Sequence, residues 1–406
     1  MHMIAIAHPQ IGTEEEEAVL EVLKSGQLEQ GERVAAFEKG FAELCQTQKA
    51  VAVSTGTAAL HLALIAHEIG YGDEVITTPF SFAATANVIV LVGAQPVFVD
   101  IDPVTCTIDP SLVEAAITSR TKAILPVHLY GNPCDMERLQ AIADEHHLVI
   151  IEDACQALAA NIQGKPVGSF GTGCFSFCAT GTMTTGEGGM ITTSDPVIAE
   201  RVRLLRNHGQ KEPYRHVALG FNQRMTELQA AIGLVQLEKL EQFTERRRAN
   251  AAYLSKHLGD VVKTPVERDG YRHVYHQYTI RVPEESSRDA WAAQLLERGI
   301  GTSVHYPCPI YQQPFYQEAR DLYRIAARPL DEEQLATIVK TPTGPLKSSN
   351  GSGPATLTAT RLDEAAYPRL PEAEKAARQV LSLPVHPALS EDDLATIVLE
   401  VLELCQ

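Results

Sequence analysis

The chain lacks long apolar runs, a basic surface composition and any cluster of Lys and Arg beyond three residues. Lys plus Arg number 34 against 51 Asp plus Glu, which gives a formal net charge of −17. A chain this acidic is a poor ligand for nucleic acid, because phosphate neutralisation needs a basic surface. The longest apolar-rich run, 83–92, is interrupted by Thr85 and Asn87 and falls short of the roughly 18 residues that a membrane span needs. We therefore expect neither nucleic acid nor a membrane as a partner.

Paired cysteine motifs and a secretory leader are also missing. The eight cysteines are dispersed and form no CxxC pair, which disfavours a disulfide framework or a zinc site. The segment 1–5 has no basic stretch leading into an apolar core. We expect a reduced, cytoplasmic protein.

Short apolar segments alternate with helical ones from about residue 50. The strand-like segments are 50–53, 74–78, 96–101, 122–127 and 148–153. Helical spacing covers 57–67, 82–92 and 135–147. Runs this short and apolar throughout are typical of a mainly parallel sheet with helices on both faces. The pattern predicts an α/β fold whose ligands collect at the carboxyl ends of the strands.

Two domains of unequal size are expected. Residues 1–245 form the large domain with an N-terminal arm, and 246–406 form a smaller α+β domain. A helical stretch over 225–248 closes the first, and we interpret its final charge cluster, 245–248, as a solvated helix end. Residues near 340–361 are rich in Pro, Gly and Ser and predict a loop or mobile insertion. The remaining chain reads as an apolar turn, 381–387, and an amphipathic helix, 391–404.

A segment of small residues lies where the first strand passes into a helix. Residues 54–60 read Ser-Thr-Gly-Thr-Ala-Ala-Leu. Backbone N–H groups at such a turn, together with the Thr57 hydroxyl, suit an anion. A simple helix N-cap explains the same pattern, so both interpretations stay open.

Three further residues follow strand ends on the same predicted edge. Phe82 can stack on a flat ring or point into the core. Asp153 ends a buried strand, where a carboxylate needs a partner. A pyridinium N–H is one such partner, and an N-cap or a loop salt bridge is another. Ser176, which precedes a glycine-rich turn, can share a phosphate with Thr57.

The order and spacing of these segments closely resemble the DegT/DnrJ/EryC1/StrS family of sugar aminotransferases, fold type I pyridoxal-phosphate enzymes. The resemblance runs from Gly-Gln-Leu at 26–28 to Leu-Pro-Val-His-Pro at 383–387. Landmarks between them are 54–64, 126–131, 151–154, 220–225 and 304–307. It implies a large domain with a mainly parallel sheet of the seven-stranded type between helices, and a smaller C-terminal α+β domain.

The resemblance implies pyridoxal 5'-phosphate or pyridoxamine 5'-phosphate as the cofactor, held here without a covalent link. Thr57, the backbone around Ala58, and Ser176 would hold its phosphate. Phe82 would stack on the pyridine face, and Asp153 would pair with the ring nitrogen.

The same resemblance implies contacts beyond the ring and phosphate. Gln156 would lie against the 3-hydroxyl of the cofactor. Asn222 would reach the cofactor of a partner subunit, which makes a homodimer the functional unit. His305 and Tyr306 would belong to the substrate-side loop.

One position departs from the family pattern in a way that bears on catalysis. The family stretch Ser-Phe-Tyr-x-Thr-Lys-Asn carries the Schiff-base lysine, whereas 176–182 read Ser-Phe-Cys-Ala-Thr-Gly-Thr. Gly181 therefore stands at the lysine position and supplies neither a nucleophile nor a proton acceptor. Cys178, Thr180 and His208 are imaginable substitute bases.

Four functional interpretations follow. The first is amino transfer from L-glutamate to a nucleotide-linked keto sugar, by a protein that lacks the usual lysine. The second is a pyridoxamine-phosphate-dependent keto-sugar dehydratase with a substitute base. The third is a non-catalytic pseudoenzyme that pairs with an active paralogue. The fourth, an introduced substitution at Gly181, fits less well because Cys178 and Thr182 depart from the pattern too.

Overall fold

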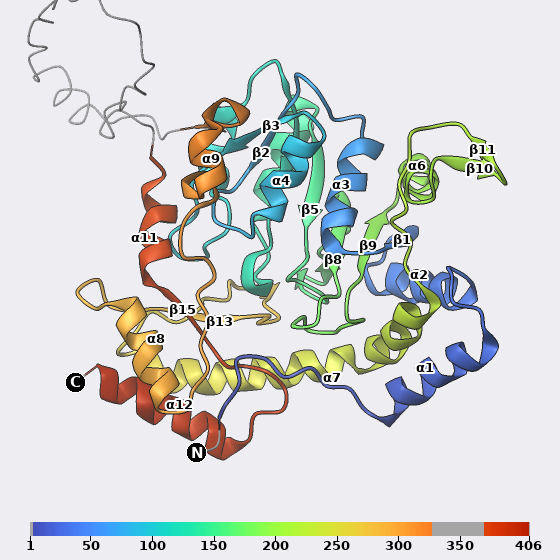
Figure 1. Ribbon diagram of the computed structural model, residues 1–406. Helices are drawn as coiled ribbons and strands as arrows, with labels where there is room; N and C mark the ends of the chain where they lie inside the picture. Colours follow the sequence, from blue (N-terminus) through green and yellow to red (C-terminus); the bar gives the residue numbers. More distant parts are fainter. Residues whose placement is uncertain (1–2, 327–368, 406) are drawn as a thin grey trace, which may run out of the picture.

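The computed structural model describes residues 3–326 and 369–405 (Figure 1). The insertion expected near 340–361 lies outside these residues. Within the described ranges, no helix combines the length and the apolar character that crossing a membrane requires.

An eight-stranded sheet takes seven strands from the N-terminal half of the chain and one from residues 324–325. Its spatial order is β1-β9-β8-β5-β4-β2-β3-β14. The strands are β1 Lys49–Val53, β2 Glu74–Thr77, β3 Gln95–Phe98, β4 Thr121–Leu125, β5 Val149–Asp153, β8 Thr172–Ser176, β9 Gly189–Thr193 and β14 Arg324–Ile325. Only β9 runs against the others, so the expected mainly parallel sheet is confirmed. The short β14 adds an eighth strand at the edge, beside β3.

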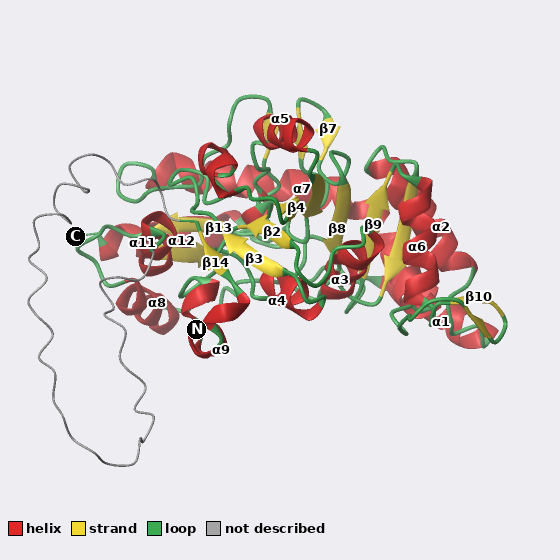
Figure 2. Ribbon diagram, turned by 90° about the horizontal axis from the view of Figure 1, so that it is seen from above, coloured by secondary structure: helices red, strands yellow, loops and turns green. Residues whose placement is uncertain are grey.

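Helices cover both faces of this sheet (Figure 2). One face carries α3 Gly56–Ala66, α4 Ala84–Leu91 and α6 Pro196–Arg206, which share one apolar core with the strands. The other face carries α2 Glu32–Leu44, α5 Met136–His146 and the first part of α7 Glu227–Leu258. Strands buried on both faces explain why their sequences are apolar throughout.

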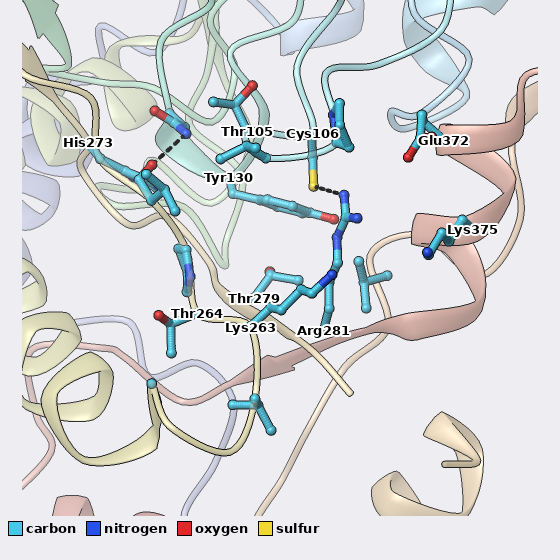
Figure 3. Close-up of a pocket in the computed structure, with 18 residues that line it drawn as sticks. Thr105, Cys106, Tyr130, Lys263, Thr264, His273, Thr279, Arg281, Glu372 and Lys375 are labelled. Carbon is cyan, nitrogen blue, oxygen red and sulfur yellow. Dashed lines mark hydrogen bonds between the residues drawn. The ribbon is translucent and has the colours of Figure 1, made fainter. Parts of the chain in front are cut away.

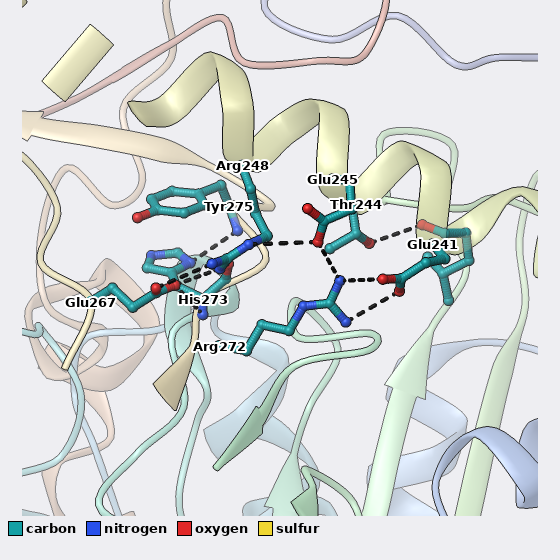
Figure 4. Close-up of polar contacts among 9 residues, drawn as sticks. Glu241, Thr244, Glu245, Arg248, Glu267, Arg272, His273 and Tyr275 are labelled. Atoms are coloured by element: carbon teal, nitrogen blue, oxygen red, sulfur yellow. Dashed lines mark hydrogen bonds and ion pairs between the residues drawn. The ribbon is translucent and has the colours of Figure 1, made fainter. Parts of the chain in front are cut away.

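The helix α7 corrects one expectation from the sequence. It spans 32 residues without a break, so the charge cluster at 245–248 lies inside the helix and the expected solvated helix end is wrong. Arg247 is only 5% exposed. Arg248 pairs with Glu267, and Arg272 reaches Glu245 of the helix (Figure 4). Both partners, Glu267 and Arg272, follow α7 in the chain. The charged residues that we expected to be solvated therefore form ion pairs that hold α7 against the segment after it.

The C-terminal part packs around the second half of α7. Its core joins α8 Arg288–Glu297 and α12 Glu391–Leu404 to an antiparallel pair, β13 Tyr278–Arg281 and β15 Val380–Leu383. The expected apolar turn at 381–387 is therefore wrong in its first half, which forms β15. The predicted helix over 391–404 is confirmed. Ile4 packs in this same core, and the division into two domains at residue 245 stays a prediction.

The remaining elements are short or peripheral. They are α1 Thr13–Ser25, β6 Asn161–Ile162, β7 Lys165–Pro166, β10 Gln210–Glu212, β11 Arg215–His216, β12 Tyr271–Arg272, α9 Pro314–Glu318 and α11 Pro371–Gln379.

Candidate active site

A cavity of about 610 Å³ opens beside the carboxyl ends of β5 and β8 and the start of α3. Nine of the residues singled out in the sequence line it, namely Thr57, Phe82, Asp153, Gln156, Ser176, Cys178, Thr180, His305 and Tyr306. They come from segments spread over 250 residues, and the parallel strands bring them to one edge of the sheet.

The start of α3 forms one end of the cavity. Thr55 is the N-cap, and its Oγ1 accepts a hydrogen bond from the Ala58 N–H at 3.0 Å. The N-cap interpretation therefore holds for Thr55, and Ala58 is buried and does not line the cavity. Thr57 remains exposed to the cavity.

Close packing brings the helix start against β8. A Cβ at Gly56 would lie 2.6 Å from Ser176 Cβ, so only glycine permits this approach. The hydroxyls of Thr57 and Ser176 consequently line the same cavity at the positive end of the α3 dipole, an arrangement that suits an oxyanion.

Asp153, at the end of β5, is the buried carboxylate of the cavity. Its Oδ2 accepts a hydrogen bond from Thr85 Oγ1 at 2.7 Å, and its Oδ1 accepts one from the Cys155 N–H at 3.2 Å. Burial raises the pKa of Asp153, and no ion pair joins it to any described Lys or Arg. The carboxylate thus retains lone pairs and has no Lys or Arg partner in the described chain, while the charge of the His128 ring offsets part of the effect of burial.

Thr85 was not recognised as a site residue from the sequence. It lies on α4, and its Oγ1, which donates its one hydrogen to Asp153, accepts a second hydrogen bond from Ser81 Oγ at 2.9 Å. The one signal in the sequence is that Thr85 interrupts an otherwise apolar run.

The neighbouring carboxylate has a different role. Glu152 is fully buried and accepts backbone N–H bonds from Gly168, Phe170 and Gly171 at 2.7–3.0 Å. It also bonds to His128 Nε2 at 3.2 Å, while the Nδ1 of that ring faces the Cys134 N–H. Glu152 is therefore a structural acceptor behind the sheet edge, and of these two neighbouring carboxylates only Asp153 lines the cavity.

An aromatic residue and an amide shape the opposite wall. Phe82 is 61% exposed, so it does not point into the core, and its ring centroid lies 6.2 Å from that of Tyr306. Gln156 Nε2 donates to Tyr306 Oη at 3.0 Å, and its Oε1 accepts from the Tyr130 N–H at 2.7 Å. Gln156 thereby fixes the 305–306 loop against the end of β5.

Two histidines complete this wall. His305 Nδ1 bonds to Ser382 Oγ at 3.0 Å, and burial lowers its pKa. His276 was missed in the sequence, where it merely opens the segment before β13. Burial, with Arg247 nearby, lowers the pKa of His276 to about 3, so the ring is neutral at physiological pH.

The segment around Gly181 borders the cavity but contributes no lysine side chain to its wall. Cys178 and Thr180 line the cavity, and the Gly181 N–H donates to the Cys178 carbonyl at 3.0 Å. A Cβ at Gly181 would lie 2.7 Å from the Met183 carbonyl oxygen. Among the residues that line the cavity in the described chain, none is a lysine.

Two other residues singled out in the sequence lie away from the cavity of this single chain. His208 and Asn222 are exposed and do not line it. Asn222 bridges to Asn207 at the base of the β10–β11 hairpin.

The mixed sheet between two helical layers is the fold type I architecture of pyridoxal-phosphate aminotransferases. A putative sugar aminotransferase, Spr1654 from Streptococcus pneumoniae, superposes with a TM-score of 0.84 at 27% identity, covering 100% of this chain and 98% of that one. Its solved structures include a pyridoxamine-phosphate form and a pyridoxal-phosphate form.

The chain belongs to the DegT/DnrJ/EryC1/StrS aminotransferase family, whose model matches residues 9–346. It is 43% identical over 389 residues to a pleiotropic regulatory protein of Geobacillus stearothermophilus, covering 94% of this chain and 92% of that protein. It is 42% identical over 309 residues to a UDP-N-acetyl-3-dehydro-alpha-D-glucosamine 3-aminotransferase of Acidithiobacillus ferrooxidans, covering 75% and 83% of the two chains. The family resemblance inferred from the sequence is thereby confirmed.

Proposed function

We propose that the cavity binds pyridoxal 5'-phosphate or pyridoxamine 5'-phosphate without a covalent link, in an aminotransferase-family protein whose substrate is a nucleotide-linked keto sugar and whose amino donor is L-glutamate. The observation that carries this proposal is Asp153, a buried carboxylate with a raised pKa and no Lys or Arg within ion-pair distance in the described chain. A protonated ring nitrogen would place a cation directly against this carboxylate.

The other lining residues fit the same group. Thr57 and Ser176 hold the phosphate at the start of α3, where the helix dipole favours an anion. Phe82 offers an exposed ring face on which the pyridine ring would stack, and Gln156, which lines the same cavity, would contact its 3-hydroxyl. When bound, the cofactor supplies an electron-withdrawing ring that stabilises negative charge on a substrate carbon.

Two further parts of the proposal concern the substrate and a second subunit. His305 and Tyr306 bind the sugar side of the substrate, since they close the cavity opposite the start of α3. Asn222, exposed in a single chain, reaches the cofactor of a second subunit, so the functional unit is a homodimer.

Gly181 leaves two candidate functions, one with amino transfer and one in which the protein only binds the cofactor. With glycine at the lysine position, no lysine in the described cavity wall can carry the proton between substrate and cofactor. A ligand-binding protein without amino transfer is therefore the second candidate, and the likeness to a relative described as a pleiotropic regulatory protein supports it.

An absorbance titration separates these forms. The purified protein is titrated with pyridoxal phosphate and then with L-glutamate, alongside Gly181→Lys. Conversion to the pyridoxamine form by the unmodified chain supports amino transfer with a substitute base. Binding without conversion, together with conversion by Gly181→Lys, supports the ligand-binding form with an otherwise intact site.

Two other outcomes have distinct meanings. Loss of a hydroxyl from a keto sugar in the presence of pyridoxamine phosphate would support the dehydratase. Absence of heat in calorimetry with either cofactor form would overturn the proposal altogether.

A further inference from the structure

Figure 3 shows a second cavity, of about 460 Å³. It is bounded by the loop 103–106 after β3, the segment 259–266 after α7, the strand β13 and the helix α11. It shares no lining residue with the candidate active site. Neither the family resemblance nor the proposed function uses it.

Positive charge gathers in this second cavity although the whole chain is acidic. Its wall holds Arg281, Lys263 and Lys375, against a single carboxylate from Glu372. Lys375 pairs with Glu284. Arg281 and Lys263 have no carboxylate within ion-pair distance in the described ranges.

The backbone holds two of these cations side by side. Lys263 and Arg281 face each other across an antiparallel bridge and exchange both backbone hydrogen bonds, at 3.2 and 2.9 Å. Directly opposed residues on neighbouring strands have adjacent side chains, and like charges there are destabilising. An anion between the two side chains would turn this repulsion into attraction.

Arg281 is the group that most needs such a partner. Its side chain is buried, at 7% exposure, and its guanidinium donates to Cys106 Sγ at 3.1 Å. A thiol satisfies one of five N–H donors, and no other side-chain hydrogen bond of Arg281 is formed within the described chain. Figure 3 shows the guanidinium directed across the cavity toward Cys106, beside the Tyr130 ring.

We propose that this second cavity binds a small anionic metabolite through its phosphate or carboxylate group, with Arg281 and Lys263 as the direct ligands. A guanidinium fork matches either oxyanion, and a buried guanidinium is stable when it is paired. The cavity is larger than an oxyanion alone, and its apolar wall, from Val262, Pro265 and Val266, accommodates the rest of the molecule.

Tyr130 connects this ligand site to the candidate active site. Its ring lines the second cavity, while its N–H donates to Gln156 Oε1 and its hydroxyl donates to the His305 carbonyl. Both acceptors belong to residues that line the first cavity. Tyr130 therefore forms part of the second cavity while it holds two residues of the first in place.

Calorimetric titration with inorganic phosphate and with succinate tests the proposal, at an ionic strength held constant with sodium chloride. The protein binds at least one of the two, and Arg281→Gln weakens that binding about tenfold or more, as expected for a charge-assisted pair. Lys263→Gln weakens it less, because this side chain is exposed. Arg138→Gln, the same loss of charge at an exposed position of α5, leaves it unchanged. The anion that binds identifies the headgroup.

Ser176→Ala separates this site from the proposed phosphate cradle of the first cavity. Arg281-dependent binding persists in Ser176→Ala, whatever becomes of cofactor binding. Equal affinities of the unmodified chain and Arg281→Gln would overturn the proposal, as would the absence of heat with both anions.

A second readout avoids any variant that fails to fold. Cys106 lies against Arg281 in the cavity wall, so a bound anion slows its alkylation by iodoacetamide, followed by peptide mass analysis. The exposed Cys405 serves as the internal control, since its rate stays constant. An unchanged Cys106 rate at an anion concentration that saturates the calorimetric signal would contradict the assignment.

Discussion

Replacing Asp153 by Asn removes the charge of the cavity carboxylate and keeps its shape. The amide still accepts from the Cys155 N–H and donates to Thr85 Oγ1, so the two hydrogen bonds of Asp153 are preserved in number. The lost interaction is the one with a protonated ring nitrogen. A hydrogen bond to a charged group contributes about 1.5–3 kcal/mol, so we expect pyridoxamine phosphate to bind roughly 10- to 150-fold more weakly.

Although Asp153→Asn weakens cofactor binding, it does not lower the stability of the unliganded protein. Because burial raises the pKa of Asp153 above its usual 3.8, the ionised carboxylate disfavours folding at neutral pH. This cost is present above the folded-state pKa and disappears as the pH falls through it and below 3.8. Asp153→Asn is therefore at least as stable as the unmodified chain at pH 7, and the difference shrinks on acidification.

Equilibrium dialysis of pyridoxamine phosphate and urea unfolding measure the two effects separately. Asp144→Asn, at an exposed position on α5, is the matched control and changes neither quantity. Affinity within twofold of the unmodified chain would refute Asp153 as the ring partner. If Asp153→Asn loses both affinity and stability, the fold has been damaged. That outcome would refute the argument that Asp153 acts through its charge.

Three further outcomes are expected. Glu227→Ala loses about 3 kcal/mol in urea unfolding, because this buried carboxylate on α7 accepts three backbone N–H bonds at the start of α2, whereas exposed Glu238→Ala changes stability by less than about 0.5 kcal/mol. Gly181→Ala costs about 1–3 kcal/mol in the same assay, since its Cβ would lie 2.7 Å from the Met183 carbonyl; an unchanged midpoint would contradict this geometry. Burial lowers the pKa of His273 to about 3, so stability falls as the pH drops below 6.5 toward 3, and His273→Gln flattens that slope between pH 7 and pH 5.

Hydropathy alone predicted the central sheet well. The strands β1, β2, β4 and β5 begin and end within two residues of their predicted bounds, because both faces of these strands are buried and local sequence records that burial. The two errors have a common cause. The cluster at 245–248 finds partners in Glu267 and Arg272, and the segment at 381–387 finds its strand partner β13 about a hundred residues earlier. A hydropathy pattern covers only neighbouring residues in the sequence, so it cannot reveal either of these partners.

The candidate site follows the same division. Residues at strand ends, such as Asp153 and Ser176, were predictable because parallel strands place their carboxyl ends at one edge. Thr85 and His276 were not, since a threonine within a helix and a histidine before a strand have no fixed direction until the helix and the strand are packed.

The sequence by itself determined the α/β class and the family, because both follow from the composition, order and spacing of its segments. Tertiary structure alone decided that Asp153 has no Lys or Arg partner in the described chain, and that Arg281 and Lys263 lie side by side over a second cavity. Burial, pairing and repulsion depend on distances between residues far apart in the chain, and only packing sets those distances.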